Sequence, residues 1–456
     1  MLCSFRFKKY SQSPDLVTGV QTCALPICEY FLNRKEQSMA DYKGINYLRH
    51  KLDKKRVRVD LRYKFYEMKN SALDFNISTP PQLQWWQSVI GWCAKSVDSL
   101  ADRLVFRDFK NDNFNLNEIY EMNNPDTLFN AAIQEALIGS CSFIYITPGE
   151  NGSVPRLQVI DGSDATGVID QITGLLTEGY AVLERDDNSN PIVEAYLTPY
   201  NTRIIYKERR GEINYDYPHN VPYPLLVPII YRPDAKRPFG HSRISRACMS
   251  ITDSALRTIK RGEISAEFYS YPQKYVTGLD DDASTFDKWK ASMSSMLSFE
   301  NNSDGDNHVH VGQFTQQSMQ PHLEQLKMFA SLFAGETGLT LDDLGFATDN
   351  PSSAEAIKAA HENLRLTARK AQRTFGTGFL NAGYLARCLA DDKDYQRSVL
   401  YLTKAQWEPV FEPDYASLSL IGDGAIKINQ AVPGYFDKNS LRDLTGIEPA
   451  KVEDND

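Results

Sequence analysis

The feature that most constrains the fold is an apolar periodicity that runs from Ser352 to Leu389. Apolar residues recur at three- and four-residue steps, as in an amphipathic helix: Ile357, Ala360, Leu364, Ala368, Ala371, Phe375 and Phe379. Ser352-Ser-Ala-Glu355 is the capping-box pattern that begins a helix. Unbroken, about 36 residues would span about 55 Å. Gly376, Gly378 and Gly383 predict a bend within it.

The first half of the chain combines helices with short strands. Apolar spacing predicts a helix over 81–105 and a second over about 126–138, which ends at Gly139 and leads into a strand, Ser142–Thr147. From about residue 154 to 232, short apolar runs alternate with turn signals, which indicates an antiparallel sheet. The chain is therefore predicted to belong to the α+β class.

Two further helices enclose an acidic insertion. Ser242 is the expected cap of a helix that ends before Pro272, and a partner helix is expected over about 320–334. Strands are expected at 273–277 and 308–311. Residues 271–318 carry three basic and seven acidic side chains, a net charge of −4.

The amino-terminal 38 residues are unlike the rest. Residues 15–27 resemble the translation of a common sequencing adapter, and Met39-Ala follows as a natural start. A cleavable signal would need a continuous apolar core, which Leu25-Pro-Ile-Cys28 does not supply. We expect residues 1–38 to be a non-native or disordered extension that takes no part in the fold.

The chain carries a formal net charge of −9. Residues 1–38 hold five basic and three acidic side chains, so the remainder holds 45 basic and 56 acidic, a net of −11. This balance argues against tight, sequence-independent wrapping of DNA, which needs basic surfaces, but not against DNA that slides past the protein. No apolar run reaches the length of about 18 residues that a membrane span needs. Cys93, Cys141, Cys248 and Cys388 are predicted to be reduced and buried.

Catalytic signatures are missing from the sequence. It has no phosphate-binding glycine loop and no paired-cysteine zinc spacing, and we expect no cofactor and no bound metal. His308 and His310 would share one face of a strand, and Asp280, Asp281 and Asp282 could hold a cation, but an exposed strand beside an acidic loop and a solvated turn are the favoured interpretations. The chain is predicted not to be an enzyme.

Two groups of side chains have alternative interpretations. The long helix carries six basic residues against Glu355 and Glu362, and this face would meet phosphate, an acidic neighbour or solvent: Lys358, Arg365, Arg369, Lys370, Arg373 and Arg387. Trp85, Trp86 and Trp92 are interpreted as core and subunit-contact residues, in preference to a platform for stacking bases.

The order of these segments resembles the phage portal family of the SPP1 type over nearly all of residues 39–450. The resemblance rests on Val97–Arg107, on the helix–glycine–strand step Phe129–Tyr145, and most specifically on Arg237-Pro-Phe-Gly-His-Ser-Arg-Ile-Ser-Arg246 with its continuation Glu263–Tyr275. Each stretch alone has modest specificity, and their order carries the resemblance.

The resemblance implies a portal-type subunit with eight segments. They are a non-native extension (1–38), a wing (39–240), a first stem helix (241–270), an α/β clip (271–318), a second stem helix (319–338), a tunnel loop (339–354), the long helix with the rest of the wing (355–422), and a crown or tail (423–456) that is short here.

The resemblance also implies contacts and a location. The tunnel loop would meet DNA through Thr348, Asp349, Asn350, Pro351, Ser352 and Ser353, and the clip would meet the motor and the connector through Asp280, Asp281, Asp282, Asp304 and Asp306. The implied partners are further copies in a ring of about twelve, the terminase motor, the head–tail connector, the major capsid and scaffold proteins, and double-stranded DNA, with no membrane. The implied location is the virion, with host cytoplasm during assembly.

Two alternatives stay open at this point. One is a head–tail connector or minor capsid protein, which would lack the long insertion between two stem-like helices. The other is a metal-dependent nuclease built on Asp280–Asp282, which would need a second acidic cluster.

Overall fold

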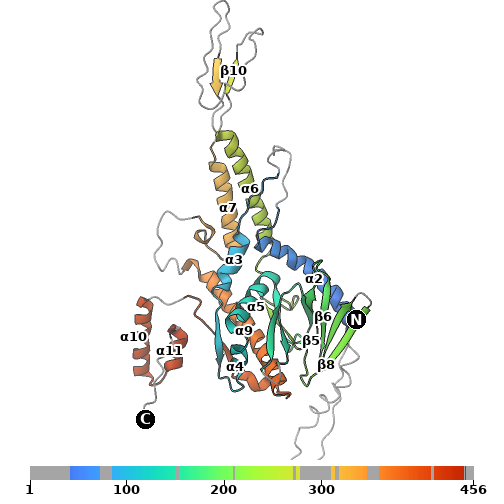
Figure 1. The fold of residues 1–456 in the computed structure, drawn as a ribbon. Coiled ribbons are helices and arrows are strands. Elements are labelled where there is room, and N and C mark those ends of the chain that lie inside the picture. Colours follow the sequence, from blue (N-terminus) through green and yellow to red (C-terminus); the bar gives the residue numbers. More distant parts are fainter. Residues whose placement is uncertain are drawn as a thin grey trace, which may run out of the picture. The chain divides into compact units, whose positions relative to one another are not determined.

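A computed structural model describes residues 42–71, 85–149, 154–208, 211–270, 274–277, 310–313, 318–346, 359–411, 415–445 and 447. Helices and antiparallel strands are mixed along the chain (Figure 1), which confirms the expected combination of helix and sheet. No helix in this part of the chain is both long and apolar enough to cross a membrane.

A three-stranded sheet forms the centre of the main core. Its order is β3 (Arg156–Ile160), β2 (Cys141–Thr147) and β9 (Leu226–Ile230). Two helices pack against it: α5 (Pro125–Gly139) and α9 (Glu362–Ala390). Residues 141–146 of β2 are all buried, as expected for a strand covered on both faces. The predicted helix 126–138 and the strand after it are confirmed.

The long helix α9 is continuous through its three glycines, and the expected bend there stays a prediction. A Cβ on Gly376 would lie 2.8 Å from the Cβ of Ala405, and one on Gly378 would lie 2.7 Å from Cδ1 of Ile229. The glycines therefore allow β12 (Lys404–Trp407) and β9 to approach the helix closely. The predicted capping box, 352–355, lies outside the described residues.

The predicted antiparallel sheet is confirmed as five strands in the order β4 (Ala165–Ile169), β5 (Leu176–Arg185), β6 (Pro191–Thr198), β7 (Asn201–Glu208) and β8 (Gly211–Pro218). Helix α2 (Ile45–Tyr66), which the sequence interpretation missed, packs against it. Leu48 and Leu52 of α2 share a small core with Tyr180 and Val182.

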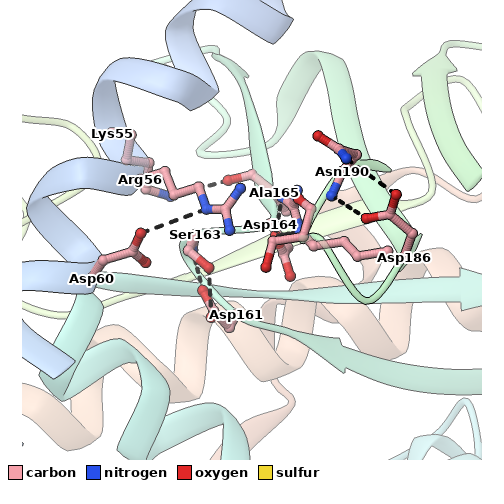
Figure 2. A network of polar contacts seen from close by, with 11 residues as sticks. Lys55, Arg56, Asp60, Asp161, Ser163, Asp164, Ala165, Asp186 and Asn190 are labelled. Carbon is pink, nitrogen blue, oxygen red and sulfur yellow. Dashed lines mark hydrogen bonds and ion pairs between the residues drawn. The ribbon is translucent and has the colours of Figure 1, made fainter. Parts of the chain in front are cut away.

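Polar contacts tie α2 to the start of β4 (Figure 2). The Lys55 ammonium donates to the carbonyl oxygen of Ala165 at 3.1 Å. Just before β4, the Ser163 hydroxyl donates to Asp161 at 2.8 Å, and Arg185 pairs with Asp164. These contacts fix the connection between the two larger sheets, because β3 ends and β4 begins on either side of it.

A buried carboxyl beside this connection makes stability depend on pH. Burial raises the pKa of Glu135 to about 7, and the charge of Asp161 adds to the rise. Oε2 of Glu135 has no hydrogen-bond partner among the described residues. Between pH 4.5 and 7 the folded protein thus holds a proton that the unfolded chain has lost, so stability falls as pH rises through this window.

Glu135→Gln is expected to remove the loss of stability that the protein suffers as pH rises. The variant and the parent should unfold alike near pH 4, whereas at pH 8 the variant should be more stable by roughly 2 kcal/mol, at about 1.4 kcal/mol per pKa unit with allowance for partial exposure. Urea unfolding at both pH values measures this difference, with exposed Glu121→Gln as the control. An equal gain at both pH values would contradict the titration of Glu135.

Two expected helix boundaries are wrong. In the described part of the predicted helix 81–105, which starts at residue 85, only α3 (Trp92–Ala101) is helical, and residues 86–91 have no regular structure. Gly91 stands directly before α3, and β1 (Phe106–Lys110), which was not predicted, comes after it and pairs with β12.

The expected cap of the next helix, α6 (Arg246–Ser270), is also wrong, because Ser242 does not cap it. Its hydroxyl donates to the carbonyl oxygen of Ile138, and Ser245 takes the cap position by accepting from the backbone N–H of Cys248 at 3.2 Å.

The remaining helices and strands are spread along the chain. They are α4 (Leu116–Glu121), α7 (Gln320–Thr337), η3 (Asp342–Leu344), η4 (Arg397–Tyr401), α10 (Tyr415–Ala431), α11 (Lys438–Thr445) and the strands β10 (Lys274–Thr277) and β11 (His310–Gln313). Helix α10 was not predicted from the sequence. Cys93, Cys141, Cys248 and Cys388 are free and buried, as predicted.

Candidate functional site

Helices α6 and α7 pack as an antiparallel pair (Figure 1). Ser245 donates to Glu336 at 2.8 Å, Thr258 donates to Gln325 at 3.2 Å, and Gly262 faces His322. Contacts therefore move backward along α7 as they move forward along α6, which is the register of an antiparallel pair. The two helices expected on either side of the insertion are confirmed.

The base of this pair is held by a buried arginine. Arg243, just before α6, donates from Nε to the carbonyl oxygen of Ser96 at 3.2 Å and from Nη2 to that of Thr337. It thereby joins α3, the start of α6 and the last residue of α7. The sequence interpretation did not single out Arg243, because its acceptors are backbone carbonyls remote in sequence.

A tryptophan-bearing segment lies along the outer half of α6. Trp86 Nε1 donates to Glu263 at 2.7 Å, and the hydroxyl of Ser88 donates to the same carboxylate oxygen at 2.8 Å. Trp92 is buried against Phe333. Trp85 and Trp86 are exposed, so a core role is wrong for these two, and subunit contact stays a prediction.

Strands β10 and β11 form the described part of the insertion. They pair antiparallel, from Lys274 opposite Gln313 to Thr277 opposite His310. Both expected strands are thus confirmed over their described residues. The predicted contact residues Asp280, Asp281, Asp282, Asp304 and Asp306 lie outside the described residues, as does His308.

The predicted DNA-contacting loop also lies outside the described residues: Thr348, Asp349, Asn350, Pro351, Ser352 and Ser353. Its surroundings are described up to Phe346. Gly338 ends α7 in the left-handed region at φ +72°, and η3 comes next with Leu344 buried. Thr340 is held there by Asp343, whose carboxylate accepts from the backbone and hydroxyl of Thr340, each at 2.9 Å. The chain thus leaves the base of the α6–α7 pair on a fixed turn.

The basic face of α9 is divided between ion pairs and a cleft. Arg365 pairs with Glu362 at 2.6 Å, and Arg387 pairs with Asp391 at 2.8 Å. Arg369 and Arg373 instead line a cleft beside η4 and β12. Within the described ranges, no three His, Cys, Asp or Glu side chains gather in a way that could hold a metal ion.

Known proteins similar to this chain are portal proteins. The portal protein of Mycobacterium phage D29 is 25% identical over 410 residues, which cover 86% of this chain and 82% of that protein. The portal protein of Mycobacterium phage L5 is 25% identical over 385 residues, which cover 80% of this chain and 77% of that protein. Among solved structures, a chain from the virion of a native gene transfer agent particle matches with a TM-score of 0.45 and 12% identity, over 79% of this chain and 90% of that one.

The family comparison covers the core, the α6–α7 pair and α9. The family described as "Phage portal protein, SPP1 Gp6-like" matches residues 45–399, from the start of α2 to the middle of η4. The expectation for residues 1–38 stays a prediction, because they lie outside the described residues. The chain belongs to the SPP1 Gp6-like family of phage portal proteins.

Proposed function

We propose that the chain is one subunit of a ring that forms the DNA channel at a capsid vertex, through which the genome is packaged and later ejected. The observation that carries this proposal is the antiparallel α6–α7 pair with β10 and β11 inserted at its far end, in a member of the portal family. A rigid pair of helices that begins and ends on one core can line a channel and present the insertion to a partner. This role requires no catalysis by the chain.

Each part of the subunit has its own role in the proposal. The sheets with α2, α3, α5 and α9 form the wing, α6 and α7 the stem, and 271–318 the clip, which docks the terminase motor and then the head–tail connector. Residues 339–354 form the tunnel loop over the DNA, and the carboxyl end from 423 forms a short crown. The ring assembles in the host cytoplasm and stays in the virion, in contact with scaffold and major capsid proteins.

The stem has the charge balance that a sliding surface needs. Helices α6 and α7 carry five basic residues (Arg246, Arg257, Lys260, Arg261 and Lys327) and five acidic ones (Asp253, Glu263, Glu267, Glu324 and Glu336). A neutral wall gains little from displacing counterions, so DNA would not adhere to it.

Exposed apolar side chains on the stem are suited to contact between subunits. Met328 and Leu332 are one helical turn apart on α7 and about half exposed, and Trp85 is 73% exposed. A ring of identical subunits needs two different complementary surfaces on each copy. These residues supply apolar area for one of them.

The ring itself is the test of this function. The protein beginning at Met39 should form closed rings of about twelve subunits, visible in electron microscopy class averages and as one large species in light scattering. The same protein carrying residues 1–38 should give the same ring size and thermal midpoint. Monomers or dimers across salt and protein concentrations would contradict the proposal.

Charge substitutions can distinguish the role of the tunnel loop from the role of the clip. Asp349→Lys should add attraction to phosphates and slow packaging more at low salt than at high salt, since salt screens this attraction. Replacing Asp280, Asp281 and Asp282 with asparagine should leave rings intact but weaken docking of the motor. Normal packaging by the first variant at every salt concentration, with no rings from the second, would show that these regions are assigned wrongly.

A further inference from the structure

A basic cleft is lined by residues outside the proposed stem, clip and tunnel loop. It has a volume of about 560 Å³ and is formed by one face of α9, by η4 and by β12. Gly376 lies on its floor, where the missing side chain lets Ala405 come close. Three segments from different parts of the carboxyl-terminal half therefore build one concave surface.

The lining of this cleft has one sign of charge. Arg369, Arg373, Arg397 and Lys404 line it, and no carboxylate of the described residues does. The chain as a whole carries a net charge of −9. Four cations around one cleft in an acidic chain attract anions to that place and not to the surface in general.

Arg397 is the most confined of the four. Its Nε donates to Oδ1 of Asn381 at 2.9 Å, and Asn381 is only 4% exposed. No carboxylate pairs with Arg397 in the described part of the chain, and burial lowers its pKa. A confined guanidinium held by a neutral amide is stabilised when an anion enters the cleft.

The other cations are available to a ligand. Neither Arg373 nor Lys404 forms an ion pair or a side-chain hydrogen bond with any described residue, in contrast to Arg365 and Arg387 on the same helix. Tyr401 is 68% exposed at the rim, beside Trp407. Guanidinium groups bind phosphate oxygens in pairs, and an ammonium adds a point charge.

We infer that this cleft binds the sugar–phosphate backbone of double-stranded DNA, an inference that rests on the proposed portal function. A portal at a capsid vertex has packaged DNA on its inner side, so phosphates are the polyanion present at high local concentration. The cleft then anchors DNA to the wing, whereas the neutral stem lets DNA pass. In this inference, one surface of the subunit binds DNA and another surface lets DNA slide past.

The test compares two charge-matched variants of the full chain. Arg373→Glu/Lys404→Glu reverses two cleft cations, and Lys54→Glu/Arg58→Glu reverses two exposed cations on α2. Binding of a labelled mixed-sequence duplex is measured by fluorescence anisotropy across salt concentrations. The cleft variant should bind more than about tenfold more weakly than the parent at low salt, and its salt slope should fall by about 2 for each engaged subunit. The control should lose less than about threefold.

Three outcomes would overturn the inference. The two variants could lose affinity equally, polyglutamate could displace the duplex as well as unlabelled DNA does, or the cleft variant alone could fail to form rings. The last result would assign the cleft to an acidic surface of a neighbouring subunit. Thermal midpoints, together with the neutral variant Arg373→Gln/Lys404→Gln, separate loss of binding from loss of fold. Failure of the portal function itself is distinct, because the parent protein would then form no rings.

Discussion

Replacing Gly240 with alanine is expected to destabilise the protein by roughly 2 to 5 kcal/mol, the sum of a left-handed backbone and a steric clash. Gly240 has φ +73°, and an added Cβ would lie 2.1 Å from the carbonyl oxygen of Tyr231. That oxygen also accepts from the backbone N–H of His241 at 2.9 Å, so it cannot move without losing a hydrogen bond. The measurement is the urea concentration at half unfolding.

Gly174→Ala is the matched control for Gly240→Ala. Gly174 has nearly the same φ, +72°, but nothing lies within 4 Å of its added Cβ. It should therefore cost only the backbone part, about 1 to 2 kcal/mol. Equal shifts for the two variants would mean that the chain around Tyr231 relaxes freely, and that the close approach is unimportant.

Arg243→Met is expected to cost roughly 2 to 5 kcal/mol, because it leaves the buried carbonyl groups of Ser96 and Thr337 without this donor. Arg243→Lys should recover part of the loss, since an ammonium keeps the charge but lacks the planar fork that reaches both oxygens. Hydrogen exchange at the end of α7 should speed up most, because that end loses its tie to α3. Urea unfolding measures the total.

Arg246→Met tests whether this effect belongs to Arg243. Arg246 is exposed at the start of α6, three residues further along the chain, and its replacement should change stability by less than about 0.5 kcal/mol. If both variants behaved alike, the base of the α6–α7 pair would be held by apolar packing and not by the guanidinium.

Local patterns predicted the elements whose apolar side faces a single layer. The helix at 126–138, the strands after residue 154 and the pair on either side of the insertion were of this kind, because their periodicity reports burial directly. The helix expected at 81–105 is wrong over residues 86–91, because the apolar spacing there does not reflect burial. Trp86 fits the helical spacing, but it lies exposed and is held by Glu263, a contact 177 residues away that no local pattern contains.

Elements held by charge at long range could not be predicted from the sequence. Helix α2 is rich in charged residues, and its position is stabilised by Arg49 pairing with the fully buried Glu194 and by Lys51 donating to the carbonyl oxygen of Gly167 at 2.6 Å. The basic cleft depends on bringing Arg397 and Lys404 to α9, and only the helix half of that site was visible as a basic face. The tunnel-loop and clip residues remain predictions.

The antiparallel register of α6 and α7 has a consequence for how such proteins diversify. Residues 246–337 leave the core and return to it at one place, where Ser245 meets Glu336 and Arg243 meets Thr337. A segment whose two ends are adjacent can be lengthened, shortened or exchanged without altering the rest of the fold. Recombination between phage genomes can therefore replace the far end of the α6–α7 pair as a cassette, while the sheets and helices of the core are inherited separately.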